Sequence, residues 1–152
     1  DEIGTTNDYR YIQDERKSGD TRWMHRPKFN WQKAELRNRP NTVENRIFSA
    51  LKKMIAVRKE VPAFADFNNR ELHDSGNPHI FAFCRVNPLH VADRVLIIGN
   101  FDAHPQHMDI ARLNPGYMQH SQLYDLYSGE KPAIFKNALV VPPYHFYWLQ
   151  AR

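Results

Sequence analysis

The chain has 152 residues, of which 41% are hydrophobic and 25% charged, values that are typical of a globular protein and exclude a disordered or fibrous chain. The formal net charge is +4, but residues 1–60 hold 14 Lys and Arg against 9 Asp and Glu, with the signs interleaved, while residues 61–152 hold 7 against 8. This pattern predicts an ion-paired surface and no nucleic-acid partner, and no apolar run approaches the roughly 18 residues that span a membrane.

The first predicted element is a long loop over residues 1–30, rich in charges and aromatic rings and without a helix or strand period. Its carboxylates are Asp1, Glu2, Asp8, Asp14 and Glu15, its arginines include Arg22 and Arg26, and its aromatic residues, with the next turn, are Tyr9, Tyr11, Trp23, Phe29 and Trp31. This mixture suits a polyhydroxylated ligand, because hydroxyls take bidentate hydrogen bonds and sugar rings stack on aromatic faces. A surface loop held by aromatics and ion pairs is the alternative. Because the chain begins inside this loop, we expect it to be a piece of a larger protein.

Two helices are predicted next. Trp31–Arg37 predicts a short helix that Arg39-Pro40 ends, because the residue before proline avoids helical geometry. The run Asn41-Thr42-Val43-Glu44 has the spacing of an N-cap followed by a carboxylate three residues on, so we expect a helix over 42–60 that ends before Val61-Pro62. An apolar stripe along this helix predicts packing against a core. The stripe consists of Ile47, Phe48, Leu51, Met54 and Ile55.

From Asn69 onward, short runs rich in β-branched and aromatic residues alternate with turn-forming clusters, a pattern typical of an antiparallel sandwich. The predicted strands are 70–73, 79–86, 94–101, 107–110, 122–127, 131–135, 139–141 and 144–151, with turns at 74–78, 114–116 and 128–130. The predicted division is a helical piece over 1–60, a linker over 61–68 and a β domain over 69–152. Together they make an α+β chain.

The sequence offers few other sites. His104, His107 and Asp109 form the tightest metal-like set, but a proline follows His104 in a predicted loop, so no metal site is expected. Cys84 lies in an apolar run and is predicted to be a buried hydrophobe. No glycine-rich phosphate loop, nucleophile elbow or Cys/His pair occurs, so phosphoryl and acyl transfer find no support, and we expect no cofactor.

The opening stretch nevertheless resembles a known family. Asp1-Glu2-Ile3-Gly4, Asn7-Asp8-Tyr9 and the run from Arg22 to Pro27 are similar to the region after the last barrel strand of amylosucrases, members of the α-amylase family of glycoside hydrolases and transglycosidases. The likeness continues at Met54–Arg58, Gly99–Phe101 and Pro143–Leu149. It is specific over residues 1–31, less so in the helix, and least in the β domain.

The resemblance implies that residues 1–60 are the last loop and helix of an eight-stranded βα barrel, followed by an amylase-type C-terminal β-sandwich. It implies an enzyme that cleaves sucrose with retention, releases fructose and passes glucose to an α-1,4-glucan acceptor. The Asp nucleophile and the Glu acid/base would lie on earlier barrel strands, so no catalytic residue is expected in this chain and the chain alone is predicted to be inactive. Active sites of such barrels sit on loops at the strand C-termini, which makes the opening stretch active-site wall.

Arg22 is the one substrate-binding residue that the resemblance carries over. It matches a family arginine that pairs with an aspartate of an earlier barrel loop and closes the bottom of the glucose pocket. Trp23 and Arg26 are expected to support the loop, and His25 to orient its neighbours. A sucrose hydrolase of the same group and a stand-alone carbohydrate-binding β domain remain alternatives. Localisation stays open between cytoplasmic and secreted.

Overall fold

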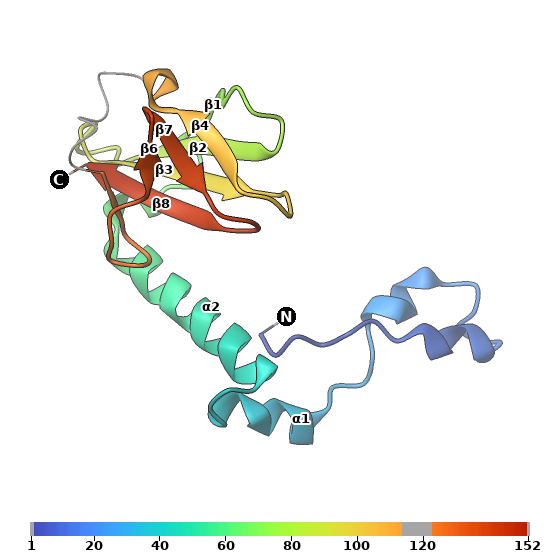
Figure 1. Ribbon diagram of the computed structural model, residues 1–152. Helices are drawn as coiled ribbons and strands as arrows, with labels where there is room; N and C mark the ends of the chain where they lie inside the picture. Colours follow the sequence, from blue (N-terminus) through green and yellow to red (C-terminus); the bar gives the residue numbers. More distant parts are fainter. Residues whose placement is uncertain (1, 114–122, 152) are drawn as a thin grey trace. The chain divides into compact units, whose positions relative to one another are not determined.

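The computed structural model describes residues 2–113 and 123–151, which belong to two compact units, Asp1–Ile55 and Ala56–Arg152 (Figure 1). The first unit holds the 3₁₀ helices η1 (Tyr9–Gln13) and η2 (Thr21–His25), then α1 (Trp31–Glu35), η3 (Leu36–Asn38) and most of α2 (Val43–Glu60). The expected short helix is confirmed as α1 and η3, and the expected long helix as α2. The predicted boundaries of the domains stay a prediction. In the described part, no helix is long and apolar enough to cross a membrane.

The N-terminal cap of α2 differs from the predicted one by a residue. Asn41 adopts a left-handed backbone with φ 68° and therefore turns the chain before the helix instead of capping it. Thr42 is the cap: its Oγ1 accepts the Asn45 N–H at 3.2 Å, and its carbonyl accepts the Arg46 N–H at 3.1 Å. Glu44 does not reach back to a cap and is buried, 3.7 Å from Lys33 Nζ.

The apolar stripe of α2 is only partly covered. Ile47, Phe48 and Met54 are half-buried, whereas Leu51 is 36% and Ile55 53% exposed. The expectation that the whole stripe packs against a core is therefore wrong for the described residues, in which Glu44 is the one buried residue of α2.

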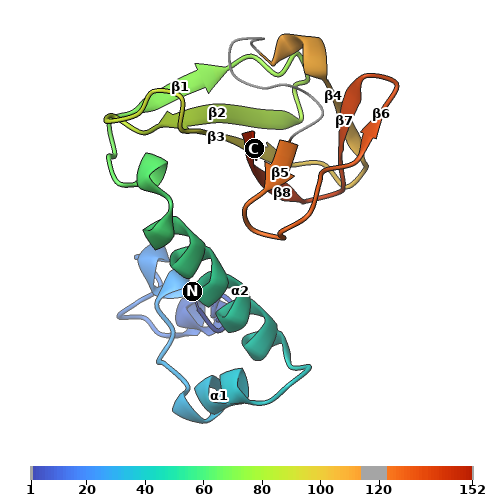
Figure 2. The ribbon, with the colours of Figure 1, turned by 90° about the vertical axis from the view of Figure 1, so that its left-hand side faces the viewer.

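After η4 (Pro62–Phe64), the second unit is built of antiparallel strands in two sheets (Figures 1 and 2). The strands are β1 (Arg70–His73), β2 (Ile80–Val86), β3 (Arg94–Asn100), β4 (Gln106–Asp109), β5 (Leu123–Asp125), β6 (Ile134–Phe135), β7 (Ala138–Val141) and β8 (Phe146–Ala151), with η5 (Ile110–Arg112) after β4. One sheet has the order β1-β2-β3-β8-β5 and the other β4-β7-β6. The predicted antiparallel sandwich is confirmed.

Strand ends differ from the predictions where the backbone turns. Ile110 leaves β4 because it begins η5, for which the Asp109 side chain accepts the Ala111 N–H at 2.9 Å. Tyr144 has φ 51°, a left-handed geometry that no strand residue adopts, so β8 begins two residues later. Gly76 and Gly129 have positive φ and confirm two of the predicted turns. The third, over residues 114–116, lies outside the described residues.

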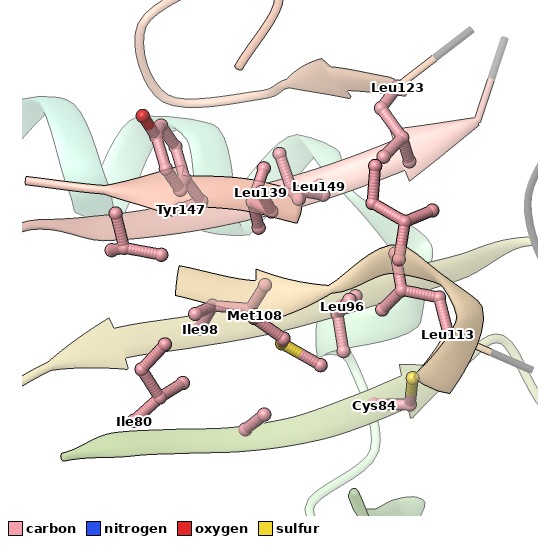
Figure 3. Close-up of a cluster of buried hydrophobic side chains, with 13 residues drawn as sticks. Ile80, Cys84, Leu96, Ile98, Met108, Leu113, Leu123, Leu139, Tyr147 and Leu149 are labelled. Atoms are coloured by element: carbon pink, nitrogen blue, oxygen red, sulfur yellow. The ribbon is translucent and has the colours of Figure 1, made fainter. Parts of the chain in front are cut away.

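The core lies between the two sheets (Figure 3). Its labelled side chains come from both layers: Ile80, Cys84, Leu96, Ile98, Tyr147, Leu149 and Leu123 from the larger sheet, Met108 and Leu139 from the smaller, and Leu113 from the segment after η5. Cys84 is buried as predicted, and desolvation raises the pKa of its thiol, so it acts as a hydrophobe.

Asn100 joins the two sheets by polar contacts at the end of β3. Its Nδ2 lies 2.9 Å from the His104 carbonyl, 3.1 Å from that of Val141 at the end of β7, and 2.9 Å from that of Pro142. Its Oδ1 accepts the Asp102 N–H at 2.8 Å. Because the residue is almost fully buried, these groups have little access to water.

Asn100→Asp is expected to lower the free energy of unfolding of the 152-residue chain by about 2 kcal/mol, since a carboxylate has no N–H to donate and turns its lone pairs toward buried carbonyls. Urea unfolding followed by circular dichroism measures the change. Asn68→Asp, at an exposed position, is the control. Equal midpoints for the two variants would contradict the role given to Asn100.

Candidate functional site

The opening segment, residues 2–30, is anchored at its first residues to the helices of the first unit, Asp1–Ile55, which we call the helical unit. Ile3 is 2% exposed, and the Gly4 carbonyl accepts a hydrogen bond from Lys33 Nζ at 3.1 Å. Gly4 has φ +63°, and a Cβ there would lie 2.6 Å from Ile47 Cδ1 of α2. The backbone angle favours glycine at this position, whereas the close approach involves only the flexible end of the Ile47 side chain. Ile3 and Gly4 therefore fix the point at which the rest of the segment leaves the surface of the helices.

The two arms of the segment are held together further along. The Asp8 N–H donates to the Met24 carbonyl at 2.9 Å, and His25 Nδ1 lies 3.1 Å from Asn7 Oδ1. These contacts bring η1 and η2 side by side although their first residues are twelve positions apart in the chain. The orienting role expected of His25 stays a prediction.

Two carboxylate–arginine clasps organise these short helices, and they are alike in sequence and geometry. Asp8 accepts from Arg10 Nε and Nη2, both at 2.8 Å, and from the Arg10 peptide N–H at 3.0 Å. Asp20 accepts from Arg22 Nε at 2.8 Å, from Nη2 at 2.8 Å and from the Arg22 peptide N–H at 3.0 Å. Each aspartate is therefore the N-cap of its 3₁₀ helix and also binds the arginine two residues on.

Arg22, the predicted substrate-binding residue, lies in η2 with a side chain that is 72% exposed. The hydrogen bond to Asp20 raises the pKa of its guanidinium, and the same contact lowers the pKa of Asp20. The aspartate that the resemblance implies as its partner would belong to an earlier barrel loop. The role of Arg22 in a glucose pocket stays a prediction.

A hollow of about 490 Å³ lies beside the Asp8–Arg10 clasp, and a second of about 330 Å³ shares four of its lining residues. The larger one is lined by Asp8, Arg10, Tyr11, Gln13, Asp14, Lys17, Trp23, Arg26, Pro27 and Lys28. Carboxylates, cations and two aromatic rings thus converge on one concave surface, as expected for a site that binds hydroxyls. Arg22 lines neither hollow.

The aromatic residues of the segment fall into separate groups. Trp23 lies under Lys17, whose Nζ is 5.4 Å from the ring centroid and 2.9 Å from Asp14 Oδ2. Phe29 and Trp31 pack edge to face with centroids 4.7 Å apart. Trp23 and Tyr11 reach the larger hollow, and Phe29 and Trp31 do not. The structure therefore brings together part of the predicted aromatic set.

The Asp8 clasp predicts an acid titration. Hydrogen bonds from Arg10 lower the pKa of Asp8 from 3.8 to about 2. Since the folded-state pKa is depressed, the stabilisation from the clasp is complete above pH 3.8 and is lost as the pH falls through about 2. Carboxyl ¹³C NMR of the chain measures this value.

In an Arg10→Gln chain, the pKa of Asp8 is expected to move back toward 3.8, whereas Arg16→Gln leaves it near 2. A wild-type Asp8 that titrates near 3.8 would show that the clasp does not form in solution.

The second unit, Ala56–Arg152, which we call the β unit, contains a histidine cluster that was not predicted. Asp102 Oδ2 lies 2.8 Å from His79 Nδ1, and Asp102 Oδ1 lies 2.9 Å from His104 Nδ1, a contact that lowers the pKa of Asp102. The pairing of Ile80 with Asn100 brings this carboxylate and His79 together, so only the register of β2 and β3 could have revealed the set. In the described part of the chain, no three His, Cys, Asp or Glu side chains are placed to hold a metal ion.

Comparison with known proteins places the fold. No protein-family model matches the chain. The structure is similar to that of pullulanase from Anoxybacillus sp. LM18-11 in its complex with maltotriose, with a TM-score of 0.53 and 11% sequence identity. A second structure of that pullulanase gives a TM-score of 0.54 at the same identity. In both, the match covers 80% of this chain and 16% of the pullulanase chain, so the chain spans about one sixth of the length of the proteins that it matches.

Proposed function

We propose that this chain is the C-terminal part of a carbohydrate-active enzyme of the α-amylase family, and specifically of a retaining α-glucosyltransferase that cleaves sucrose and passes glucose to an α-1,4-glucan. Pullulanase is a glycoside hydrolase of the α-amylase family, which supports the wider assignment. The likeness of the opening stretch to amylosucrases supports the narrower one. No cofactor is required by this chemistry.

The observation that carries the wider assignment is the extent of the fold match. The β unit Ala56–Arg152 has 97 residues, or 64% of the chain, whereas the similarity to pullulanase covers 80%. The match therefore extends into the helical unit. This favours a chain in which both units belong to one enzyme over a β domain with an unrelated appendage.

The proposed chemistry divides between this chain and the preceding part of the enzyme. Retention requires two carboxyl groups roughly 5–5.5 Å apart across the glycosidic bond, one a nucleophile and the other an acid/base. We assign both to preceding barrel strands. Arg22 would face an aspartate of another barrel loop and close the pocket behind one glucosyl unit, which favours sucrose over internal glucan bonds. Its outward, exposed guanidinium supports this assignment.

Exposed apolar residues on α2 support the proposal that other elements of the enzyme pack against this helix. Val43, Leu51 and Ile55 are exposed on a helix whose apolar stripe has the spacing of a buried face. In the proposed enzyme this helix is the last of the barrel, and the preceding barrel elements would cover it.

Expression of the complete enzyme that contains this segment tests the proposal. With sucrose as the only sugar, we expect fructose release together with insoluble α-glucan that an α-1,4-specific amylase digests. Equal amounts of glucose and fructose without glucan would identify the sucrose hydrolase alternative. Absence of fructose release would contradict both. The 152-residue chain alone is expected to release no fructose.

A second candidate is a stand-alone carbohydrate-binding β domain, which the self-contained core of the β unit favours. It predicts a cooperative melt for residues 61–152 alone and measurable binding of maltotriose or longer α-glucans by calorimetry. The enzyme proposal expects no glucan affinity from that fragment.

A further inference from the structure

The guanidinium of Arg22 is occupied on one edge and open on the other. It carries five N–H groups, and Asp20 takes the one on Nε and one on Nη2. Two N–H groups on Nη1 and the second on Nη2 remain, and in the described residues Arg22 has no other side-chain partner. These form the end of the fork, where two parallel N–H groups match a carboxylate or a pair of sugar hydroxyls.

The same carboxylate fixes the backbone beneath that fork. Asp20 Oδ1 accepts the Arg22 peptide N–H at 3.0 Å as the N-cap of η2, and its side chain is less exposed than that of Arg22. The Asp20 carboxylate therefore holds both the backbone and the guanidinium of Arg22. An arginine has several rotatable bonds, and holding its fork in advance removes the entropy loss that binding would otherwise require.

We propose that Asp20 is the positioning residue of the pocket-closing arginine: it holds the Nε and Nη2 edge of Arg22, so that the Nη1 and Nη2 end faces outward in a fixed direction. This inference rests on the proposed function, in which that end meets the second carboxylate and the sugar. Asp20 contacts neither directly.

Asp20→Asn separates this role from a structural one. Asparagine is as good an N-cap as aspartate, so η2 keeps its cap, while the charge that holds the guanidinium is lost. In the 152-residue chain, NMR is expected to show hydrogen exchange of the Arg22 Nε–H about tenfold faster in Asp20→Asn than in wild type, with Arg10 unchanged. Asp8→Asn should give the reverse pattern. An Arg22 exchange rate that does not respond to Asp20→Asn would overturn the proposal.

The complete enzyme gives the functional readout. Asp20→Asn is expected to raise KM for sucrose about tenfold while kcat changes less than twofold, because the ion-pairing end of Arg22 remains but is no longer held. Asp74→Asn is the matched control: Asp74 also caps a turn and pairs with an arginine, Arg112 at 2.9 Å, but it lies in the β unit. Equal KM values in the two variants would refute a positioning role. A wild-type enzyme that releases no fructose contradicts the proposed function instead, and the NMR comparison still decides whether Asp20 orients Arg22.

Discussion

Under the proposed function, replacement of Arg22 by alanine in the complete enzyme is expected to lower kcat/KM for sucrose about 100-fold or more, without loss of the folded state. In the proposed pocket Arg22 pairs with a second aspartate away from water. Removing one partner of a desolvated ion pair leaves the other charge uncompensated, and this costs far more than losing an exposed pair. In the structure, Arg22 is outward and contributes nothing to a core, so the fold has no need of it. The loss should therefore appear in the kinetics and not in the melting temperature.

Initial rates of fructose release across a sucrose series measure this effect. Arg22→Lys is expected to lie between alanine and wild type, because lysine keeps the charge but lacks the planar pair of donors. Arg112→Ala is the control, since it removes another exposed, aspartate-paired arginine from the β unit. Similar kcat/KM values for Arg22→Ala and Arg112→Ala would contradict the assignment of Arg22 to the sugar pocket.

Leu149→Ala is expected to destabilise the β unit by about 2–5 kcal/mol, because it creates a cavity where the two sheets meet. Leu149 is 0% exposed and lies on β8 opposite Leu96 of β3 and Asp125 of β5, in the interior of the larger sheet. β8 itself is hydrogen-bonded on both sides, to β3 and to β5, so it has little freedom to collapse into the space.

Leu72→Ala provides the same chemical change at an 81% exposed position of β1 and should alter stability by less than about 0.5 kcal/mol. Urea unfolding curves of the two variants and the wild-type chain give the comparison. A loss of similar size in both would mean that the sandwich core is not packed as described.

Local signals predicted most of the secondary structure, and the deviations have local causes. The apolar stripe from Ile47 to Ile55 predicted the helix correctly, because the helical spacing of its residues is the same whether or not other elements cover that face. Its cap was assigned one residue early because Asn and Thr both cap well, and only the positive φ of Asn41 decides between them. Tyr144 belongs to a strand by composition, but its backbone turns.

Strand order could not be predicted from local pattern. The alternation in β3 and β8 shows that each has a buried face, yet it does not say that Leu96 pairs with Leu149 or that β5 follows beyond β8. The same limit explains why His79 and Asp102 were not placed together. Register is a property of pairs of segments, and a periodicity describes one segment at a time.

The candidate site was predictable only in part. The resemblance selected Arg22, and the Asp-x-Arg spacing that places Asp20 beside it was visible in the sequence but has no meaning until the 3₁₀ turn is known. Composition singled out the carboxylates and aromatics of the opening segment. It could not show that Trp23 lines the hollow while Trp31 packs on Phe29.

The position of β8 also has a consequence for synthesis on the ribosome. β8 lies between β3 and β5, and its partner residues on β3 precede it by about fifty positions. Until residues 146–151 have emerged from the exit tunnel, β3 presents an unpaired edge next to the apolar face that carries Leu96 and Ile98. The larger sheet therefore completes late, and the nascent chain is most prone to mispair with a neighbouring chain during that interval.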